Sequence, residues 1–472
     1  MAGKDVVQLY YTAPYTEAGI EKAHVNLGAF AKTNLLQPGE SEVVTLQLVA
    51  QDMASFDWND ANDNGFRGYE LEAGDYVLSI RSNAHDEIAS ITRTIPSDIQ
   101  CTTDYTTGAE IRPLFGGDEG LEDYKSTNDT LENNLMSRGS GLELPAPLNR
   151  EERTWSQVEV DELDSQKTFF SCDDTEEDPW YVSQVPSTWT QNKGERDEDG
   201  KTAIQLADLM GLSYTEPTVV GGVATAATDE GTQKWDEYMN QLTWEELTTI
   251  VSYGGFGQPG VETIGKKQNG AYDAAAHPFW NGGMFGGAQP PEDQMGTNWV
   301  TPAVWGCTWN VDLLRQIGVM TGNEALFFNV NGLYGFSTNI HRSPFGGRNF
   351  EYLSEDGLLS GKLLAALCKA CTEKGLVTYT KHFMMNNQET NRNTNGGVMT
   401  WATEQAIREI YAKPYEIAVK EGNNSAFMTA FNRIGKSTCS DNYALLELLT
   451  RGEWGFCGHN VTDYMDYAEY RY

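Results

Sequence analysis

The sequence has few basic residues: 33 Lys and Arg stand against 68 Asp and Glu in 472 residues, so the formal net charge is −35. A field of that sign repels phosphate backbones and anionic lipid surfaces. We therefore expect neither a nucleic-acid partner nor a membrane partner. An uncharged small molecule is indifferent to this field, and the acidity by itself favours solubility.

The sequence also lacks a long hydrophobic run, because no stretch of 18 apolar residues occurs in it. Met1 begins no segment with the charged and apolar parts of a secretory signal. On these grounds we expect a cytoplasmic protein. The length allows two to four domains, and 39% hydrophobic residues is an ordinary globular composition.

Cysteine is scarce, with seven in the chain, and an odd number scattered over this length argues against a disulfide framework. A reducing compartment is the simpler interpretation. Cys368 and Cys371 form one CxxC inside the helix-like run Gly357 to Lys374, with no second cysteine pair or histidine pair nearby. We therefore interpret them as buried small residues, with no metal or redox role.

Residues 1–95 read as a small β-sandwich, because short, alternating, β-branched runs are separated by Pro, Gly, Asn and Asp clusters. Within them, the run Asp60 to Gly65 mimics the start of a calcium loop. The twelfth position of that loop is Leu71 instead of Glu, and no helices flank it, so we interpret it as a turn and expect no metal. The predicted strands are Asp5–Tyr11, Glu42–Val49, Tyr76–Ser82 and Glu87–Arg93.

Residues 96–230 are polar and acidic, and we interpret them as a connector that contains one helix at Ala203–Leu212. From residue 231 to 472 the pattern alternates between helices and strands, which predicts a parallel sheet. Thr243 and Glu246 are placed as a capping box inside the first helix. The predicted helices are Trp235–Val251, Asp312–Asn329, Gly357–Lys374, Trp401–Glu421 and Asp441–Trp454, and the predicted strands are Tyr334–Ile340, Leu376–Phe383, Ala426–Phe431 and Asn460–Thr462.

Three motifs lie at the ends of predicted strands in this part of the chain. They are SPFGGRNFEYLSEDG at residues 343–357, KHFMMNNQETNR at residues 381–392, and GEWGFCGHNVTDY at residues 452–464. In this order they closely resemble the barrel domain of family 3 glycoside hydrolases, which includes β-glucosidases. The segments GKDVVQLYYTAPY and YELEAGDYVLSI resemble the fibronectin type III-like domain that accompanies those enzymes.

The resemblance implies a multidomain fold: a partial fibronectin III-like β-sandwich followed by an incomplete (β/α)₈ TIM-type barrel. Sandwich before barrel resembles a circularly permuted bacterial subgroup, and the chain looks truncated at both ends, since it stops nine residues after Asp463. In that subgroup the catalytic acid/base lies on an α/β sandwich domain. We therefore expect no acid/base in this chain.

The resemblance also implies a set of site residues. Asp463, in its VTD context, matches the nucleophile of the family. Lys381 and His382 match a sugar-binding pair, and Arg348 and Arg392 match two further binding residues. A guanidinium suits paired hydroxyl groups and a nearby carboxylate. Glu351 and Glu355 are expected to orient these cations.

The remaining positions depart from the family pattern. Asp273 is the best match to a sugar-binding Asp, but the Gly and Pro that follow that Asp in the family are lost here. Phe431 stands where many members have Tyr, and Tyr464 follows Asp463 where the family often has Trp. All three are kept as expected substrate-binding residues.

The leading interpretation is a retaining β-glucosidase-like hydrolase that forms a covalent glycosyl–Asp463 intermediate on a carbohydrate substrate, with no cofactor. The alternative is a non-catalytic carbohydrate-binding homologue, or an inactive fragment without the acid/base domain. A Schiff-base aldolase that uses Lys381 is a third, weaker reading. A homodimer or a complementing chain that supplies the missing pieces is a further expectation. The sequence does not choose among glucose, xylose and N-acetylglucosamine.

Overall fold

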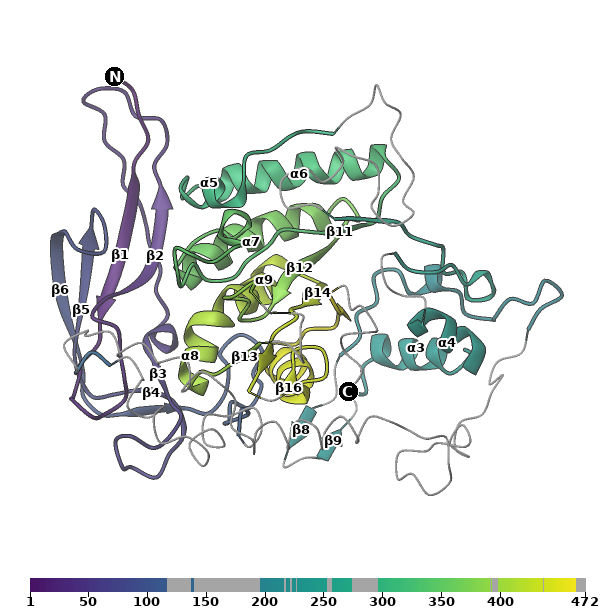
Figure 1. The fold of residues 1–472 in the computed structure, drawn as a ribbon, viewed down its shortest axis with the longest axis horizontal. Helices are drawn as coiled ribbons and strands as arrows, with labels where there is room; N and C mark the ends of the chain where they lie inside the picture. Colours follow the sequence, from purple (N-terminus) through teal and green to yellow (C-terminus); the bar gives the residue numbers. More distant parts are fainter. Residues whose placement is uncertain are drawn as a thin grey trace.

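The computed structural model describes residues 1–116, 137–139, 196–215, 218–220, 223–225, 227–252, 257–273, 296–390, 392, 398–435 and 437–463. Most of the predicted connector and the expected substrate-binding residue Tyr464 lie outside these residues. Figure 1 shows the N-terminal strands on one side of a layer of helices, with the remaining elements beyond it.

The N-terminal part contains two antiparallel sheets. The first has the order β2-β1-β5-β6 and the second the order β3-β4-β7. Three of the four predicted strands are confirmed as β1, β5 and β6. A buried cluster that includes Met53, Leu71 and Tyr76 packs beside them. The strands are β1 Val6–Thr12, β2 Asn26–Lys32, β3 Ser55–Asp57, β4 Gly68–Leu71, β5 Gly74–Arg81, β6 Glu87–Ile95 and β7 Ile99–Cys101.

The fourth predicted strand, Glu42–Val49, is wrong. The segment alternates as predicted, with Val44, Leu46 and Leu48 half-buried and the residues between them exposed. However, it forms no ladder with a neighbouring strand in the described part of the chain. The carboxylate of Glu42 instead accepts hydrogen bonds from the backbone and side chain of Asn34 at 2.8 Å each. The alternating pattern therefore predicted which side chains face the protein, but not whether the backbone pairs with a neighbouring strand.

The C-terminal part is built on a parallel sheet of order β10-β11-β12-β14-β17. Helices separate consecutive strands, as the alternating pattern predicted. Within the described residues the sheet has five strands, so a closed eight-stranded barrel stays a prediction. The strands are β10 Ala271–Asp273, β11 Gly332–Tyr334, β12 Val377–Phe383, β14 Ala426–Thr429 and β17 His459–Val461.

Helices cover this sheet close to the predicted positions. The predicted helix Trp401–Glu421 is three consecutive segments, the second of which has π-helical hydrogen bonds, and the helix before β17 is also a π-helix. These elements are α5 Pro302–Gly306, α6 Val311–Phe327, α7 Gly357–Thr372, α8 Glu404–Ala406, η7 Ile407–Tyr411, α9 Lys413–Gly422 and η8 Ala444–Glu453.

Two predicted helices were wrong in extent. Trp235–Val251 is two helices, α3 Glu230–Met239 and α4 Trp244–Ser252. The capping box is confirmed, because Thr243 N–H donates to Glu246 at 2.8 Å and Glu246 N–H donates to the Thr243 hydroxyl at 3.1 Å. Ala203–Leu212 forms only a 3₁₀ turn, η4 Leu206–Leu209. Gly211, at φ +83°, turns the chain away at its end.

Smaller elements complete the described structure. They are η1 Ala50–Met53, β8 Thr218–Val220, β9 Val223–Thr225, η5 Glu262–Ile264, η6 Asn349–Glu351, β13 Met399–Thr400, β15 Arg433–Ile434 and β16 Ser437–Thr438.

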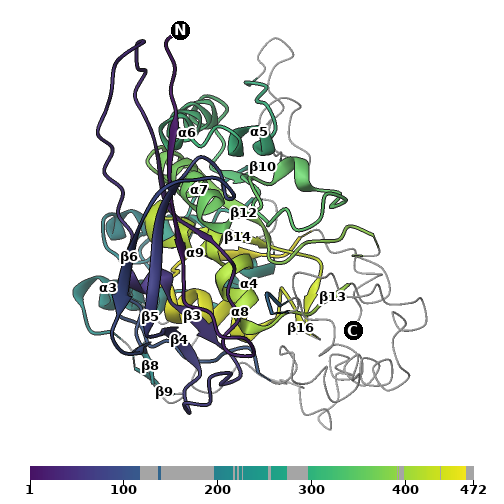
Figure 2. The same ribbon diagram turned by 90° about the vertical axis from the view of Figure 1, so that its left-hand side faces the viewer.

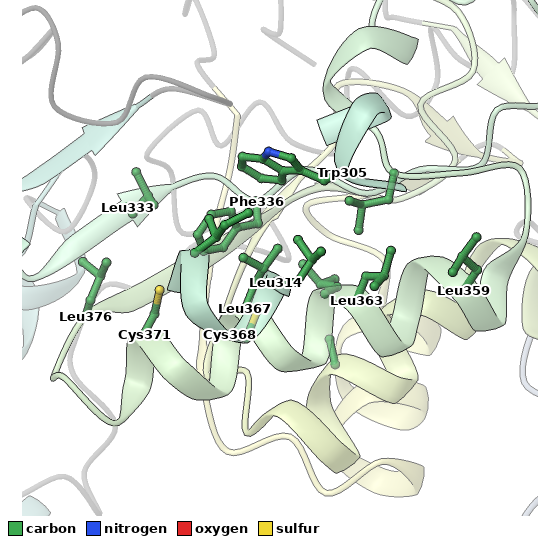
Figure 3. Packing of buried hydrophobic residues seen from close by; sticks show 14 of the residues in the cluster. Trp305, Leu314, Leu333, Phe336, Leu359, Leu363, Leu367, Cys368, Cys371 and Leu376 are labelled. Atoms are coloured by element: carbon green, nitrogen blue, oxygen red, sulfur yellow. The ribbon is translucent and has the colours of Figure 1, made fainter. Parts of the chain in front are cut away.

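The main core lies between α6, α7 and the parallel strands (Figure 3). Leu314, Leu363 and Leu367 are fully buried in it, and burial of each such side chain contributes about 1.5–3 kcal/mol. Cys368 and Cys371 also lie in this core, as the sequence predicted. Burial raises the pKa of the Cys368 thiol to about 12, so it stays protonated and unreactive.

The N-terminal sheet packs directly on the helices. Tyr10 of β1 and Leu27 of β2 belong to the same buried cluster as α7, and Figure 2 shows this sheet in front of the helices. Arg408 of η7 lies 4.6 Å from the centre of the Phe56 ring and forms ion pairs with Glu404 and Glu453. This contact joins the second N-terminal sheet to the start of the helical run that follows β12.

None of the helices described is both long and apolar enough to cross a membrane.

Candidate active site

The carboxyl ends of the parallel strands bring most of the expected site residues together. Asp273 ends β10, Lys381 and His382 lie near the end of β12, and Asp463 follows β17 by two residues. Parallel strands end at one edge of their sheet, which in α/β proteins is the edge that carries the site. The structure therefore places four residues from three separated segments on one rim.

The strand β11 stops earlier than predicted, and the residues after it line the same rim. Tyr334–Ile340 was expected as a strand, but the strand ends at Tyr334. Beyond it, Ser337 forms a single parallel bridge to Lys381, and Thr338 N–H donates to the Lys381 carbonyl at 2.7 Å. The peptide bonds before His382 and before Met384 are cis.

Lys381 and Asp273 form an ion pair. The Lys381 side chain is 4% exposed and that of Asp273 is 20% exposed. A buried ammonium group needs a partner, and Asp273 provides it at the rim. The pairing shows that Asp273 reaches the site despite the altered sequence around it.

Asp463 lies between two nitrogen groups. Its Oδ2 atom is 3.7 Å from Nε2 of His382 and 3.7 Å from Nη1 of Arg392. The side chain is 12% exposed. A carboxylate in this position faces solvent on one side and nitrogen donors on the other.

Arg392 is held from two directions. Its Nε donates to Glu389 at 2.9 Å, and its guanidinium carbon lies 4.6 Å from the centre of the Phe431 ring. A guanidinium stacked on an aromatic face is stabilised by the ring's negative face. Phe431 therefore helps to position Arg392 beside Asp463.

Arg348 forms an ion pair with Glu351, which is 2% exposed. The other oxygen of Glu351 accepts from the Ser337 hydroxyl at 3.0 Å. Glu351 thus orients Arg348, as expected. Glu355 instead lies near Tyr10, where its charge helps to raise the pKa of that phenol, whose shift comes mainly from burial.

His382 is neutral at physiological pH. Burial, together with the positive charges of Arg348, Lys381 and Arg392, lowers the pKa of His382 well below its ordinary value. The side chain is 1% exposed. A neutral imidazole carries one donor and one acceptor nitrogen, and its hydrogen-bond partners determine which nitrogen holds the proton.

The Tyr352 hydroxyl lies between Asn386 and His382 and contacts both. Asn386 Nδ2 lies 2.7 Å from Glu389 and 2.8 Å from the Tyr352 hydroxyl. An ionised carboxylate only accepts, so Asn386 is a donor to both groups. We interpret the 3.0 Å contact between the Tyr352 hydroxyl and Nδ1 of His382 as donation by the hydroxyl. This interpretation places the proton of His382 on Nε2, the atom nearest Asp463.

The backbone of this strand tip is also fixed. The His382 carbonyl accepts from Asn339 Nδ2 at 2.9 Å and from the Tyr415 hydroxyl at 2.8 Å. Tyr415 is fully buried. Sequence reasoning missed Tyr352, Asn386, Glu389 and Tyr415. The first three lie inside the quoted motifs, so the motifs themselves carried a signal for them.

Among the residues that the structure describes, no three or more His, Cys, Asp or Glu side chains are grouped as metal ligands. The site's nitrogen groups are cationic or neutral donors that suit hydroxyl groups and a carboxylate.

Comparison with known proteins finds matches for two parts of the chain. Residues 288–471 match the family model for the Glycosyl hydrolase family 3 N terminal domain, and residues 5–84 match the Fibronectin type III-like domain. These matches identify the chain as a member of glycoside hydrolase family 3.

Particular relatives match over nearly all of the chain. It is 31% identical to Beta-glucosidase A of Butyrivibrio fibrisolvens over 99% of this chain and 50% of that protein. It is 28% identical to a Beta-glucosidase of Ruminococcus albus over 98% of this chain and 42% of that protein. A solved β-glucosidase from Paenibacillus barengoltzii has a TM-score of 0.65 and 25% identity, covering 98% of this chain and 44% of that one. The chain therefore spans about half the length of the curated relatives it matches.

Proposed function

We propose that this chain carries the nucleophile and sugar-binding half of a retaining β-glucosidase-like active site. The observation that carries the proposal is Asp463 at a strand tip, 3.7 Å from both the neutral His382 and Arg392. The similarity to proteins named β-glucosidases supports it. We also propose that the five parallel strands are part of an eight-stranded barrel.

In this mechanism an oxygen of Asp463 attacks the anomeric carbon as the bond to the leaving oxygen breaks, which forms a glycosyl–Asp463 ester. The leaving oxygen takes its proton from an acid/base carboxyl group about 5 Å from the nucleophile, and we assign none of the described residues to that role. That group then takes a proton from water, and the resulting attack releases the sugar and restores Asp463.

The other residues bind hydroxyl groups of the sugar. The Nε2–H of His382 donates to one of them, and the Lys381–Asp273 pair offers both a donor and an acceptor. Arg348 and Arg392 contribute fixed positive charge, which favours the ionised form of a nearby carboxylate. This arrangement suits a neutral, polyhydroxylated ligand.

The test uses a substrate that needs no acid catalysis. Dinitrophenyl β-glucoside releases an anion that is stable without a proton, so it isolates the nucleophile step. We expect the chain to release dinitrophenolate, and Asp463→Asn to lower the rate at least about 10³-fold, or about 4 kcal/mol in barrier height.

The control is Asp441→Asn, which removes the same charge from an exposed position and is expected to leave the rate unchanged. If the wild-type chain binds glucose but releases no dinitrophenolate, the catalytic role fails and a carbohydrate-binding role remains. If it neither binds nor reacts, both are rejected for this chain.

A further inference from the structure

The loop that joins β3 to β4, residues 58–67, is rich in side-chain oxygens and lies far from the strand tips. It turns sharply, with φ of +56° at Asp60, +57° at Asp63 and +80° at Gly65. Asp60 itself is used by the turn, since it accepts from the N–H groups of Asn64 and Gly65 at 2.9 and 3.0 Å. The oxygen-bearing side chains in the loop are Asn59, Asp60, Asn62, Asp63 and Asn64.

The strands on either side add two buried carboxylates, Asp57 and Glu70. In the β3–β4 pair, Ser55 lies opposite Glu70 and Asp57 lies opposite Gly68. Side chains alternate along a strand, so Asp57 and Glu70 project from the same face as diagonal neighbours. Both residues have 0% exposure. Two like charges are therefore buried side by side at the base of the loop.

Hydrogen bonds within the protein satisfy these carboxylates only in part. Asp57 Oδ1 accepts from the N–H groups of Asn59 and Ala61 at 3.2 and 3.0 Å. Its Oδ2 is buried with no hydrogen-bond partner among the described residues. Glu70 accepts from Asn62 Nδ2 at 3.4 Å and from Asn64 Nδ2 at 2.7 Å. A buried carboxylate oxygen without a partner is costly, so a ligand that fills this position is favoured.

Asn62 also carries an unpartnered oxygen, because its Oδ1 is buried without a hydrogen-bond partner in the described part of the chain. Lys22 is a cationic neighbour that both carboxylates influence. Its ammonium group, however, forms its ion pair with Glu72. Two buried oxygens at the loop, Asp57 Oδ2 and Asn62 Oδ1, therefore have no hydrogen-bond donor in the described part of the chain.

We propose that the 58–67 loop, together with Asp57 and Glu70, binds one Ca²⁺ ion through carboxylate and amide oxygens. Ca²⁺ takes six to eight oxygen ligands in flexible geometry, and Asn side chains are among its usual ligands. Asn62 offers its unpartnered Oδ1 as it stands, whereas the Oδ1 of Asn64 already accepts from the N–H of Phe66 at 2.8 Å. Two carboxylates neutralise the ion, which places the affinity in the weak range, with Kd about 10⁻⁴–10⁻³ M.

The sequence argument against calcium rested on Leu71 at the twelfth position of an EF-hand loop. The structure shows a different arrangement, in which Glu70 comes from a strand that pairs beside the loop. The base of the loop contributes two acidic side chains, and the remaining ligand that we assign is the amide oxygen of Asn62.

Metal titration of the full chain tests the proposal. Trp58 lies in the loop, so Tb³⁺ bound there gives luminescence on tryptophan excitation, and Ca²⁺ competes it away. We expect one saturable site and a thermal unfolding midpoint several degrees higher in CaCl₂ than in EGTA, with a smaller rise in MgCl₂. No saturable binding of either ion up to about 10 mM, well above the expected Kd, overturns the proposal.

Point substitutions in the loop test which residues bind the ion. We expect Asp57→Asn and Asn62→Ala each to weaken Ca²⁺ binding at least about 10-fold, since the first removes the charge of a ligand and the second removes a ligand. Asp63→Asn is the matched control, because it removes one charge from an exposed loop position and is expected to change binding less than about 2-fold. Equal effects of all three overturn the proposal in favour of general attraction by the net charge. If Asp57→Asn does not fold, Asn62→Ala carries the comparison.

Discussion

Replacement of Tyr352 by Phe tests the hydrogen-bond chain that sets the proton position on His382. The change removes one hydroxyl and keeps the ring, so packing is nearly unchanged. Two buried groups then lose a partner: Nδ1 of His382, at 3.0 Å, and one N–H of Asn386, at 2.8 Å. Each unsatisfied buried group costs about 1–3 kcal/mol. We therefore expect the free energy of unfolding to fall by about 2–4 kcal/mol, because the pocket is closed to water at His382.

Two measurements check this. Denaturant unfolding gives the change in stability, with Tyr443→Phe as the control, since Tyr443 is 63% exposed and its change is expected to lie within about 0.5 kcal/mol. ¹⁵N spectra of the histidine rings report the tautomer directly. In the wild type the proton of His382 is expected on Nε2, and in Tyr352→Phe this preference is lost. A wild-type proton on Nδ1, or a stability change as small as that of the control, refutes the reasoning.

Two further predictions concern the charges at the strand tips. The pKa of His382 is lowered on folding, so on acidification the unfolded chain takes up a proton at this side chain that the folded chain does not. The free energy of unfolding therefore decreases as pH falls through about 6.5, by about 1.4 kcal/mol between pH 7.5 and 5.5. The slope of stability against pH in this range is therefore expected to be shallower in His382→Gln than in the wild type, and equal slopes would contradict it. Asp273→Asn leaves Lys381 unpaired and is expected to lower the free energy of unfolding by about 2–4 kcal/mol. Adding Lys381→Met to it should cost little more, and strictly additive losses would show that the pair is not coupled.

Local sequence patterns predicted the tip of β12 well. The run before Lys381 has the length and composition of a buried strand, and β12 confirms it at Val377–Phe383. The capping box at Thr243 and Glu246 also formed, because such a box needs only residues three apart. The break at residues 240–243 was missed, since apolar spacing continues across it.

Longer-range pairing was not predictable in the same way. Tyr352, Asn386 and Glu389 meet through loops whose relative position depends on packing, and no local spacing reports it. Strand pairing in the segment Glu42–Val49 was also not predictable from local pattern. Its alternating side chains pack against the protein, but a strand also needs a neighbouring backbone to pair with. Asp273 illustrates an intermediate case, in which one residue matched a family position weakly and the ion pair with Lys381 then placed it at the site.

The most direct test of the proposed function is covalent labelling with dinitrophenyl 2-deoxy-2-fluoro-β-glucoside. The fluorine slows release of the glycosyl intermediate, so the sugar remains on the nucleophile, and mass spectrometry of proteolytic peptides locates it. The proposal predicts a single fluoroglucosyl group on Asp463 and no label in Asp463→Asn. A label on another residue, or an unlabelled chain that still binds glucose, would contradict it.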